Sequence, residues 1–207
     1  MADAKQRRTS GAREIPELTL PDLPAWQQWL VERAADSAGV WLVLAKKGTT
    51  SSTTLTYDEA LEEALCHGWI DGQLAARDES TFRRKFTPRR AGSAWSKRNT
   101  ALVERLIGEG RMRPTGLAAV EPAKADGTWE RAYGGAGAKD VPDDLAAALA
   151  TTPRARKAFD NLDAANRYAV LYRITTARRP ETRARQIEKL VAMLERGETL
   201  HPPRKKK

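Results

Sequence analysis

The sequence contains one cysteine, Cys66, and two histidines, His67 and His201, in 207 residues. A single cysteine excludes an internal disulfide and indicates a reducing compartment. Protein metal sites need several ligands of this kind close together, and Cys66 and His67 have no further Cys or His nearby. The scarcity of histidine also leaves no Ser-His-Asp or Cys-His arrangement for nucleophilic catalysis. We therefore predict neither a metal nor a cofactor, and we expect Cys66 to be a buried structural thiol.

Long hydrophobic runs are missing as well. No stretch approaches the roughly 20 apolar residues that span a bilayer, and the N-terminal residues lack the apolar core of a signal peptide. We expect no membrane insertion and a cytoplasmic location. Acidic residues are outnumbered, because 36 Lys and Arg face 27 Asp and Glu, which gives a net charge of +9. This charge favours an anionic small molecule or an acidic protein surface as partner, and it argues against direct capture of cationic peptides.

The most informative patterns lie in residues 57–99. Thr56 and Glu59 have the spacing of a capping box, in which each side chain satisfies a free backbone N–H group of the other residue. This pattern predicts a helix that begins directly after Thr56. Gly68 is placed to supply the left-handed residue that ends such a helix.

A β-hairpin is predicted next, with strands over 69–77 and 81–87 joined by residues 78–80. Alternation along the strands predicts an apolar face of Ile70, Leu74, Ala76, Phe82 and Phe86. It assigns the opposite face to Trp69, Asp71, Gln73, Arg83 and Lys85. Trp69 is then either an exposed stacking plane beside fixed charge or a core residue that a helix covers. Gly72 indicates a bend or a close backbone approach.

The segment over residues 80–103 holds seven Lys and Arg and no acid. Ser93 is expected to cap a helix that carries Trp95, and free backbone N–H groups at that helix start would suit a phosphate or carboxylate. The alternative is a solvated basic rim with Trp95 as a packing anchor. The predicted ligand-binding residues are Trp69, Asp71, Arg83, Arg89, Arg90, Ser93, Trp95, Ser96, Arg98 and Asn99.

The rest of the chain sets the fold class. A helix is expected from about Leu23, a continuous apolar strand over 40–44, and mostly helices after residue 99. Together these elements predict an α+β fold, with a small antiparallel sheet of three or more strands packed with helices, followed by a helical C-terminal unit. The predicted organisation is a flexible arm (1–20), an α+β domain (21–139), a helical unit (140–198) and a basic tail (199–207).

Four ordered stretches between residues 55 and 198 carry a further signal: YDEALEEALCHGWIDG, FTPRRAGSAWSKRN, GRMRPTGLAAVEPAKADG and NRYAVLYRITTARRPETRARQIEKLVAMLERGE. Together they resemble the YdeI/OmpD-associated family, also described as bacteriocin-protection proteins. The resemblance implies a small bacterial α+β protein with a helical C-terminal part and a role in stress or antimicrobial-peptide tolerance. It supplies no set of catalytic residues. The family name suggests an association with the envelope, whereas this sequence indicates the cytoplasm.

Three classes of function follow from these patterns. The first is a non-enzymatic protection protein that binds an anionic ligand or acidic partner through the basic-aromatic segment. The alternative is a nucleic-acid-binding protein, because residues 154–185 hold nine Lys and Arg against three acids, with Tyr168 and Tyr172 among them. An enzyme is the third class, with Asp71, facing Arg83 or Lys85, as the acid best placed to act as a base, although the pattern favours a salt bridge for that residue.

Overall fold

The computed structural model describes residues 14–49, 52–135 and 140–202. Over these residues the protein has eight helices and four strands, which confirms the predicted α+β class. The chain divides between Arg89 and Arg90 into two compact units. Residues 1–13 of the predicted arm and 203–207 of the predicted tail lie outside the described part of the chain.

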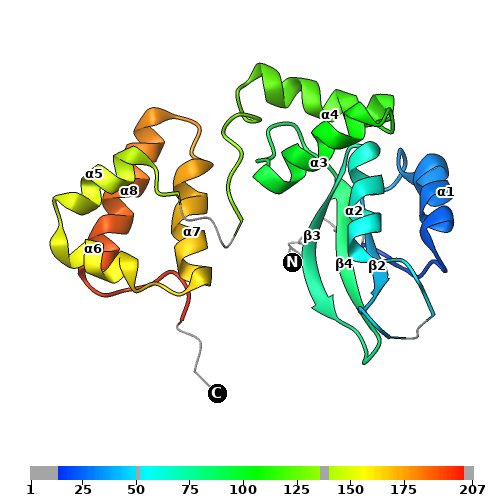
Figure 1. Ribbon diagram of the computed structural model, residues 1–207, viewed down its shortest axis with the longest axis horizontal. Coiled ribbons are helices and arrows are strands. Elements are labelled where there is room, and N and C mark those ends of the chain that lie inside the picture. The colour runs from blue at the N-terminus through cyan, green and yellow to red at the C-terminus, as the bar shows by residue number, and fades with distance from the viewer. Residues whose placement is uncertain (1–13, 50–51, 136–139, 203–207) are drawn as a thin grey trace, which may run out of the picture. The chain divides into compact units, whose positions relative to one another are not determined.

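The first unit is built on a four-stranded sheet in the order β1-β2-β4-β3 (Figure 1). Its strands are β1 (Glu17–Leu18), β2 (Val40–Ala45), β3 (Trp69–Ala76) and β4 (Thr81–Pro88). β1 runs parallel to β2 and the other pairs are antiparallel, so the sheet is mixed rather than purely antiparallel as we predicted. β1 lies inside the arm predicted over 1–20, and the arm prediction is wrong for these two residues. A two-residue strand has no periodicity that a sequence can reveal.

Two helices accompany this sheet, α1 (Leu23–Arg33) and α2 (Tyr57–Cys66). The predicted capping box of α2 is confirmed: the Thr56 hydroxyl accepts from the Glu59 N–H at 3.4 Å, and the Glu59 carboxylate accepts from the Thr56 N–H at 2.9 Å. Gly68 follows α2 with φ of +77°, the left-handed conformation expected of a helix-ending glycine.

Both helices pack on the same face of the sheet. Trp26 of α1 donates from its indole N–H to the carbonyl of Ala60 in α2 at 3.2 Å, and its ring lies 5.8 Å from that of Phe86. Trp29 meets Trp69 edge to face at 5.7 Å. These contacts close an aromatic and aliphatic core whose fully buried members include Trp26, Leu30, Leu42, Leu44, Leu61, Leu65 and Phe86.

A β-bulge in β3 decides which side chains reach this core. The register of β3 against β4 shifts between Asp71 and Leu74, at the glycine where we predicted a bend, Gly72. Because an extra residue reverses the alternation, Trp69 and Asp71 share the helix-covered face with Phe86, whereas Ile70 turns to the other side. The predicted faces are therefore correct for β4 and for Leu74 and Ala76, and wrong before the bulge. The faces of the residues before the bulge follow from three cross-strand pairs: Trp69 with Pro88, Ile70 with Thr87, and Asp71 with Phe86.

The second unit contains the remaining helices of the described chain: α3 (Lys97–Gly108), α4 (Pro114–Ala125), α5 (Asp143–Ala150), α6 (Pro153–Asp160), α7 (Ala164–Thr175) and α8 (Pro180–Glu195). Prolines begin α4, α6 and α8, where a missing N–H costs nothing and the fixed φ suits the first turn. Helices α5 to α8 share one apolar core of Leu145, Leu149, Ala155, Phe159, Val170, Leu171, Ile174, Ile187, Leu190 and Leu194.

Candidate functional site

The ten predicted ligand-binding residues are split between the two units. Trp69, Asp71, Arg83 and Arg89 belong to the first unit, and Arg90, Ser93, Trp95, Ser96, Arg98 and Asn99 belong to the second.

In the first unit, Trp69 and Asp71 have structural partners. Trp69 is 2% exposed, so the interpretation as a helix-covered core residue is the one that the structure supports, and the expected exposed stacking plane is absent. Asp71 accepts from the Tyr57 hydroxyl at 2.9 Å and from Arg84 Nε at 3.0 Å. The Arg84 guanidinium also lies 5.0 Å from the centroid of the Tyr57 ring. Asp71 therefore faces Arg84, whereas the sequence suggested Arg83 or Lys85.

The opposite face of the sheet does carry a tryptophan beside basic side chains, and that tryptophan is Trp41. Trp41 pairs with Lys85 across β2 and β4, and the Arg83 guanidinium lies 5.3 Å from the centroid of its ring. Sequence reasoning missed Trp41 because the run over 40–44 is apolar throughout. Alternation along β2 would have been the only local signal, since Leu42 and Trp41 point to opposite faces.

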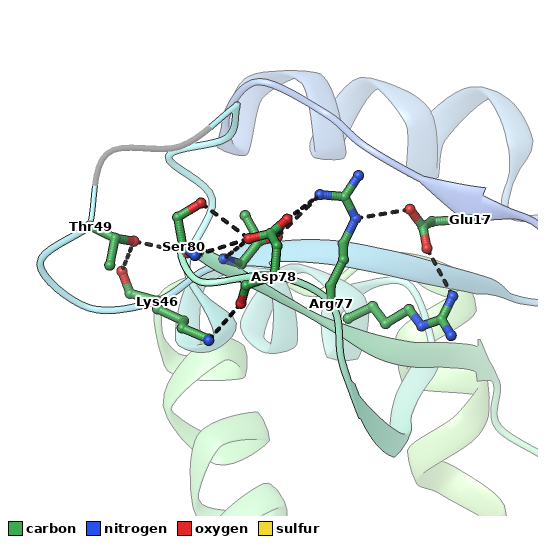
Figure 2. Close-up of polar contacts among 8 residues, drawn as sticks. Glu17, Lys46, Thr49, Arg77, Asp78 and Ser80 are labelled. Atoms are coloured by element: carbon green, nitrogen blue, oxygen red, sulfur yellow. Dashed lines mark hydrogen bonds and ion pairs between the residues drawn. The ribbon is translucent and has the colours of Figure 1, made fainter.

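Acidic residues already neutralise this basic face (Figure 2). Glu17 of β1 accepts from Arg77 Nε at 3.0 Å and from Arg83 at 2.9 Å. Asp78 accepts from Arg77 at 2.7 Å and from the hydroxyl of Thr81 at 2.6 Å. Hydrogen bonds from Thr81 and Ser80 hold the pKa of the Asp78 carboxyl far below its usual range, so it stays charged.

The described residues of the first unit carry more acids than bases. Its described residues include eight Lys and Arg against twelve Asp and Glu, a net charge of −4. The described residues of the second unit include 19 Lys and Arg against 14 Asp and Glu, a net charge of +5. The described residues of the unit that carries the hairpin thus lack the basic character of the whole chain, although the hairpin itself is rich in arginine.

In the second unit, residues 90–93 form a tight turn before α3. The Arg90 carbonyl accepts from the Ser93 N–H at 3.0 Å and from the Ser93 hydroxyl at 2.8 Å. Gly92 has φ of +74°, which suits a residue without a side chain. Ser93 is therefore a turn residue, and the prediction that it caps the helix is wrong.

Ser96 is the cap of α3 instead, and its hydroxyl accepts from the Asn99 N–H at 3.2 Å. The helix starts three residues later than expected because Ser93 is committed to the turn. Trp95 is 3% exposed and its ring lies 4.7 Å from that of Trp129. It is a packing anchor, as the alternative interpretation held, and it offers no stacking surface for a ligand.

Distant residues of the second unit meet this turn. Arg178, in the connection between α7 and α8, donates to the Gly92 carbonyl and lies 3.7 Å from the Asp126 carboxylate. The Tyr133 N–H donates to the Trp95 carbonyl at 2.9 Å, and its ring lies 4.8 Å from that of Tyr172 in α7. The predicted basic turn and the predicted basic helices are therefore neighbours.

We refer to Arg90, Arg178 and Arg179 together as the basic junction. All three side chains are exposed. Arg178 is engaged by Gly92 and Asp126, whereas the Arg90 and Arg179 side chains make no hydrogen bond or ion pair to any other described residue. Exposed guanidinium groups of this kind are suited to phosphate or carboxylate oxygens, which they can bind through two parallel hydrogen bonds.

Comparison with protein families finds two matches, and the first of them crosses the boundary between the two structural units. Residues 139–197 match the family described as "Bacteriocin-protection, YdeI or OmpD-Associated". The C-terminal helices are therefore similar to the YdeI/OmpD-associated family. This confirms the resemblance for that part of the chain, which holds α5 to α8 and two arginines of the basic junction. Residues 18–119 match a different family, described as "Domain of unknown function (DUF8412)", and most of the first three stretches that suggested the resemblance lie there.

Comparisons with curated proteins and with solved structures gave no match. The two family matches leave residues 120–138 between them, next to the boundary predicted at residue 139, which stays a prediction. None of the helices in the described ranges combines the length and apolar character of a membrane-spanning segment.

Proposed function

We propose that this is a bacteriocin-protection-type protein that binds an anionic ligand or an acidic protein surface at the basic junction of its second unit. The family of residues 139–197 suggests the protection-type role. The observation that supports the binding mode is the division of charge, because the second unit is basic while the first is acidic in its described residues.

The contacts of the junction explain why anions would gather there. Arg178 holds the turn over residues 90–93 against the connection between α7 and α8, so Arg90 and Arg179 belong to segments that are fixed together. Two guanidinium groups without acidic partners attract an anion more strongly than groups that are already paired, such as Arg183, which donates to Asp144 at 2.5 Å and 2.9 Å. Arg90 is the one predicted ligand-binding residue that belongs to the basic junction.

Binding of a fluorescent decaglutamate peptide over a salt series tests this proposal. The double variant R90A/R179A should bind about 30-fold more weakly, since two charge contacts are lost and each contributes on the order of 1 kcal/mol. The control is R154A/K157A, which removes two exposed charges from α6 of the same unit. Equal weakening in both double variants would show that only the overall field of the unit acts.

A competition experiment identifies the partner, and a survival assay tests the biological role. Pyrophosphate competing better than decaglutamate would indicate a small anion, and tighter binding of a single-stranded oligonucleotide would move the nucleic-acid alternative to first place. Cells that express the protein should survive a bacteriocin better than cells that lack it, and R90A/R179A should remove that advantage. Full protection by R90A/R179A would separate the protection role from the basic junction.

A further inference from the structure

A second site lies in the first unit, in a cleft of about 400 Å³. Residues directly before β1 form one wall, α1 contributes Trp29 and Arg33, and residues 36–39 between α1 and β2 complete the lining. This cleft shares no residue with the basic junction, and the charges that line it have the opposite balance.

Trp29 gives the cleft an aromatic surface. Trp26 stacks on the indole of Trp29 at 5.3 Å with 14° between the ring planes, and Trp69 meets it edge to face. These neighbours fix the ring, yet Trp29 remains half-buried rather than buried. Part of a rigidly held indole is thus available to the cleft, and tryptophan is the best aromatic partner for an organic cation.

Three charged side chains line the same cleft: Glu14, Arg33 and Asp36. Within the described ranges, none of these side chains makes a hydrogen bond or ion pair with another residue. The neighbouring acids Glu17 and Asp78 behave differently, since both are bound by arginine. Two carboxylates against one guanidinium leave the lining with an excess of negative charge, in a unit whose described residues are acidic overall.

We propose that this cleft binds an organic cation, a guanidinium or primary ammonium group on a short aliphatic chain. The cation lies against the Trp29 indole and is neutralised by the carboxylates of Glu14 and Asp36. Ile15 and Ala38 supply apolar wall for the aliphatic chain. The overall charge of +9 suggested that the protein repels cations, but the sequence of the first unit, Met1–Arg89, holds 12 Lys and Arg against 13 Asp and Glu, so the excess of positive charge belongs to the second unit.

Isothermal titration of the full-length protein with butylguanidinium tests the proposal, with pentanoate as the anionic counterpart. The wild-type protein should bind butylguanidinium saturably and pentanoate not at all. E14Q/D36N should weaken binding at least tenfold, because both compensating charges are lost. R33Q should strengthen it about threefold, since a like charge leaves the cleft.

The control is E32Q, which neutralises one acid of α1 outside the cleft, at a residue that accepts from Gln28 at 2.9 Å. It should leave the affinity for butylguanidinium within twofold of wild type. Absence of saturable heat, equal binding of pentanoate, or an equal effect of E32Q and E14Q/D36N would each overturn the proposal. Comparison of butylguanidinium with the capped peptide acetyl-Gly-Arg-Gly-amide then distinguishes a free small cation from a peptide side chain.

Discussion

Replacement of Trp69 by alanine separates a core residue from a ligand-stacking residue. An aromatic side chain buries roughly 150–250 Å², which at about 25 cal/mol per Å² corresponds to about 4–6 kcal/mol. That figure is an upper bound because the unfolded chain already buries some of this area, and Trp-to-Ala changes in cores usually cost about 3–5 kcal/mol. With Trp69 2% exposed, we expect W69A to destabilise the first unit by about 4 kcal/mol.

Labelling of the Cys66 thiol measures this loss in the first unit alone. Cys66 is the only cysteine of the chain, and it is fully buried on α2, as we predicted. A thiol reagent therefore reacts only after local or global opening of this unit. A loss of about 4 kcal/mol should accelerate labelling roughly 1,000-fold in the limit where opening is a rapid equilibrium.

W41A is the matched comparison, since Trp41 is half-buried on the other face of the same sheet. Its loss should destabilise the unit by about 2 kcal/mol, because only part of the ring is removed from water. Labelling of W69A within tenfold of wild type, or equal acceleration by W41A and W69A, would contradict the assignment of Trp69 to the core.

Two further predictions concern stability. G39A should destabilise the first unit by about 2 kcal/mol or more in urea unfolding, because Gly39 has φ of +141° and a Cβ there would lie 2.8 Å from the Phe86 carbonyl oxygen. The control is G108A, which should be neutral or slightly stabilising, since a Cβ at that residue meets no atom within 4 Å. Arg183 lowers the pKa of Asp144, so this pair stabilises the fold above the unfolded pKa of about 3.9 and the contribution is lost as pH falls through the lower folded value. D144N should cost about 0.5–1 kcal/mol at pH 7, because the pair is partly exposed, and the gap between D144N and wild type should close in acid; a gap that persists at pH 2 would contradict this assignment.

The elements of this protein follow from local signals in its sequence. The capping box of Thr56 and Glu59, the prolines that begin α4, α6 and α8, and the glycine after α2 act within one or two turns of backbone, so their effects are readable without knowledge of the fold. The hairpin could be located for the same reason, because its loop and its alternation are properties of neighbouring residues. The family resemblance of the C-terminal helices is likewise a property of the sequence.

Which side chains could form a site was decided by the tertiary structure. Gly72 marked the place of a bend, but the extra residue of the bulge depends on hydrogen bonds between β3 and β4, and it moves Trp69 into the core. Trp41 lies beside Arg83 only because β2 pairs with β4, and Arg178 lies beside Gly92 although 86 positions separate them. The sequence alone determined most of the helices, the strands other than β1 and the sum of charges, since these depend on neighbouring residues and composition. Only the tertiary structure placed the boundary between the two units and formed the cleft beside Trp29, because both depend on contacts between segments that local propensity does not specify.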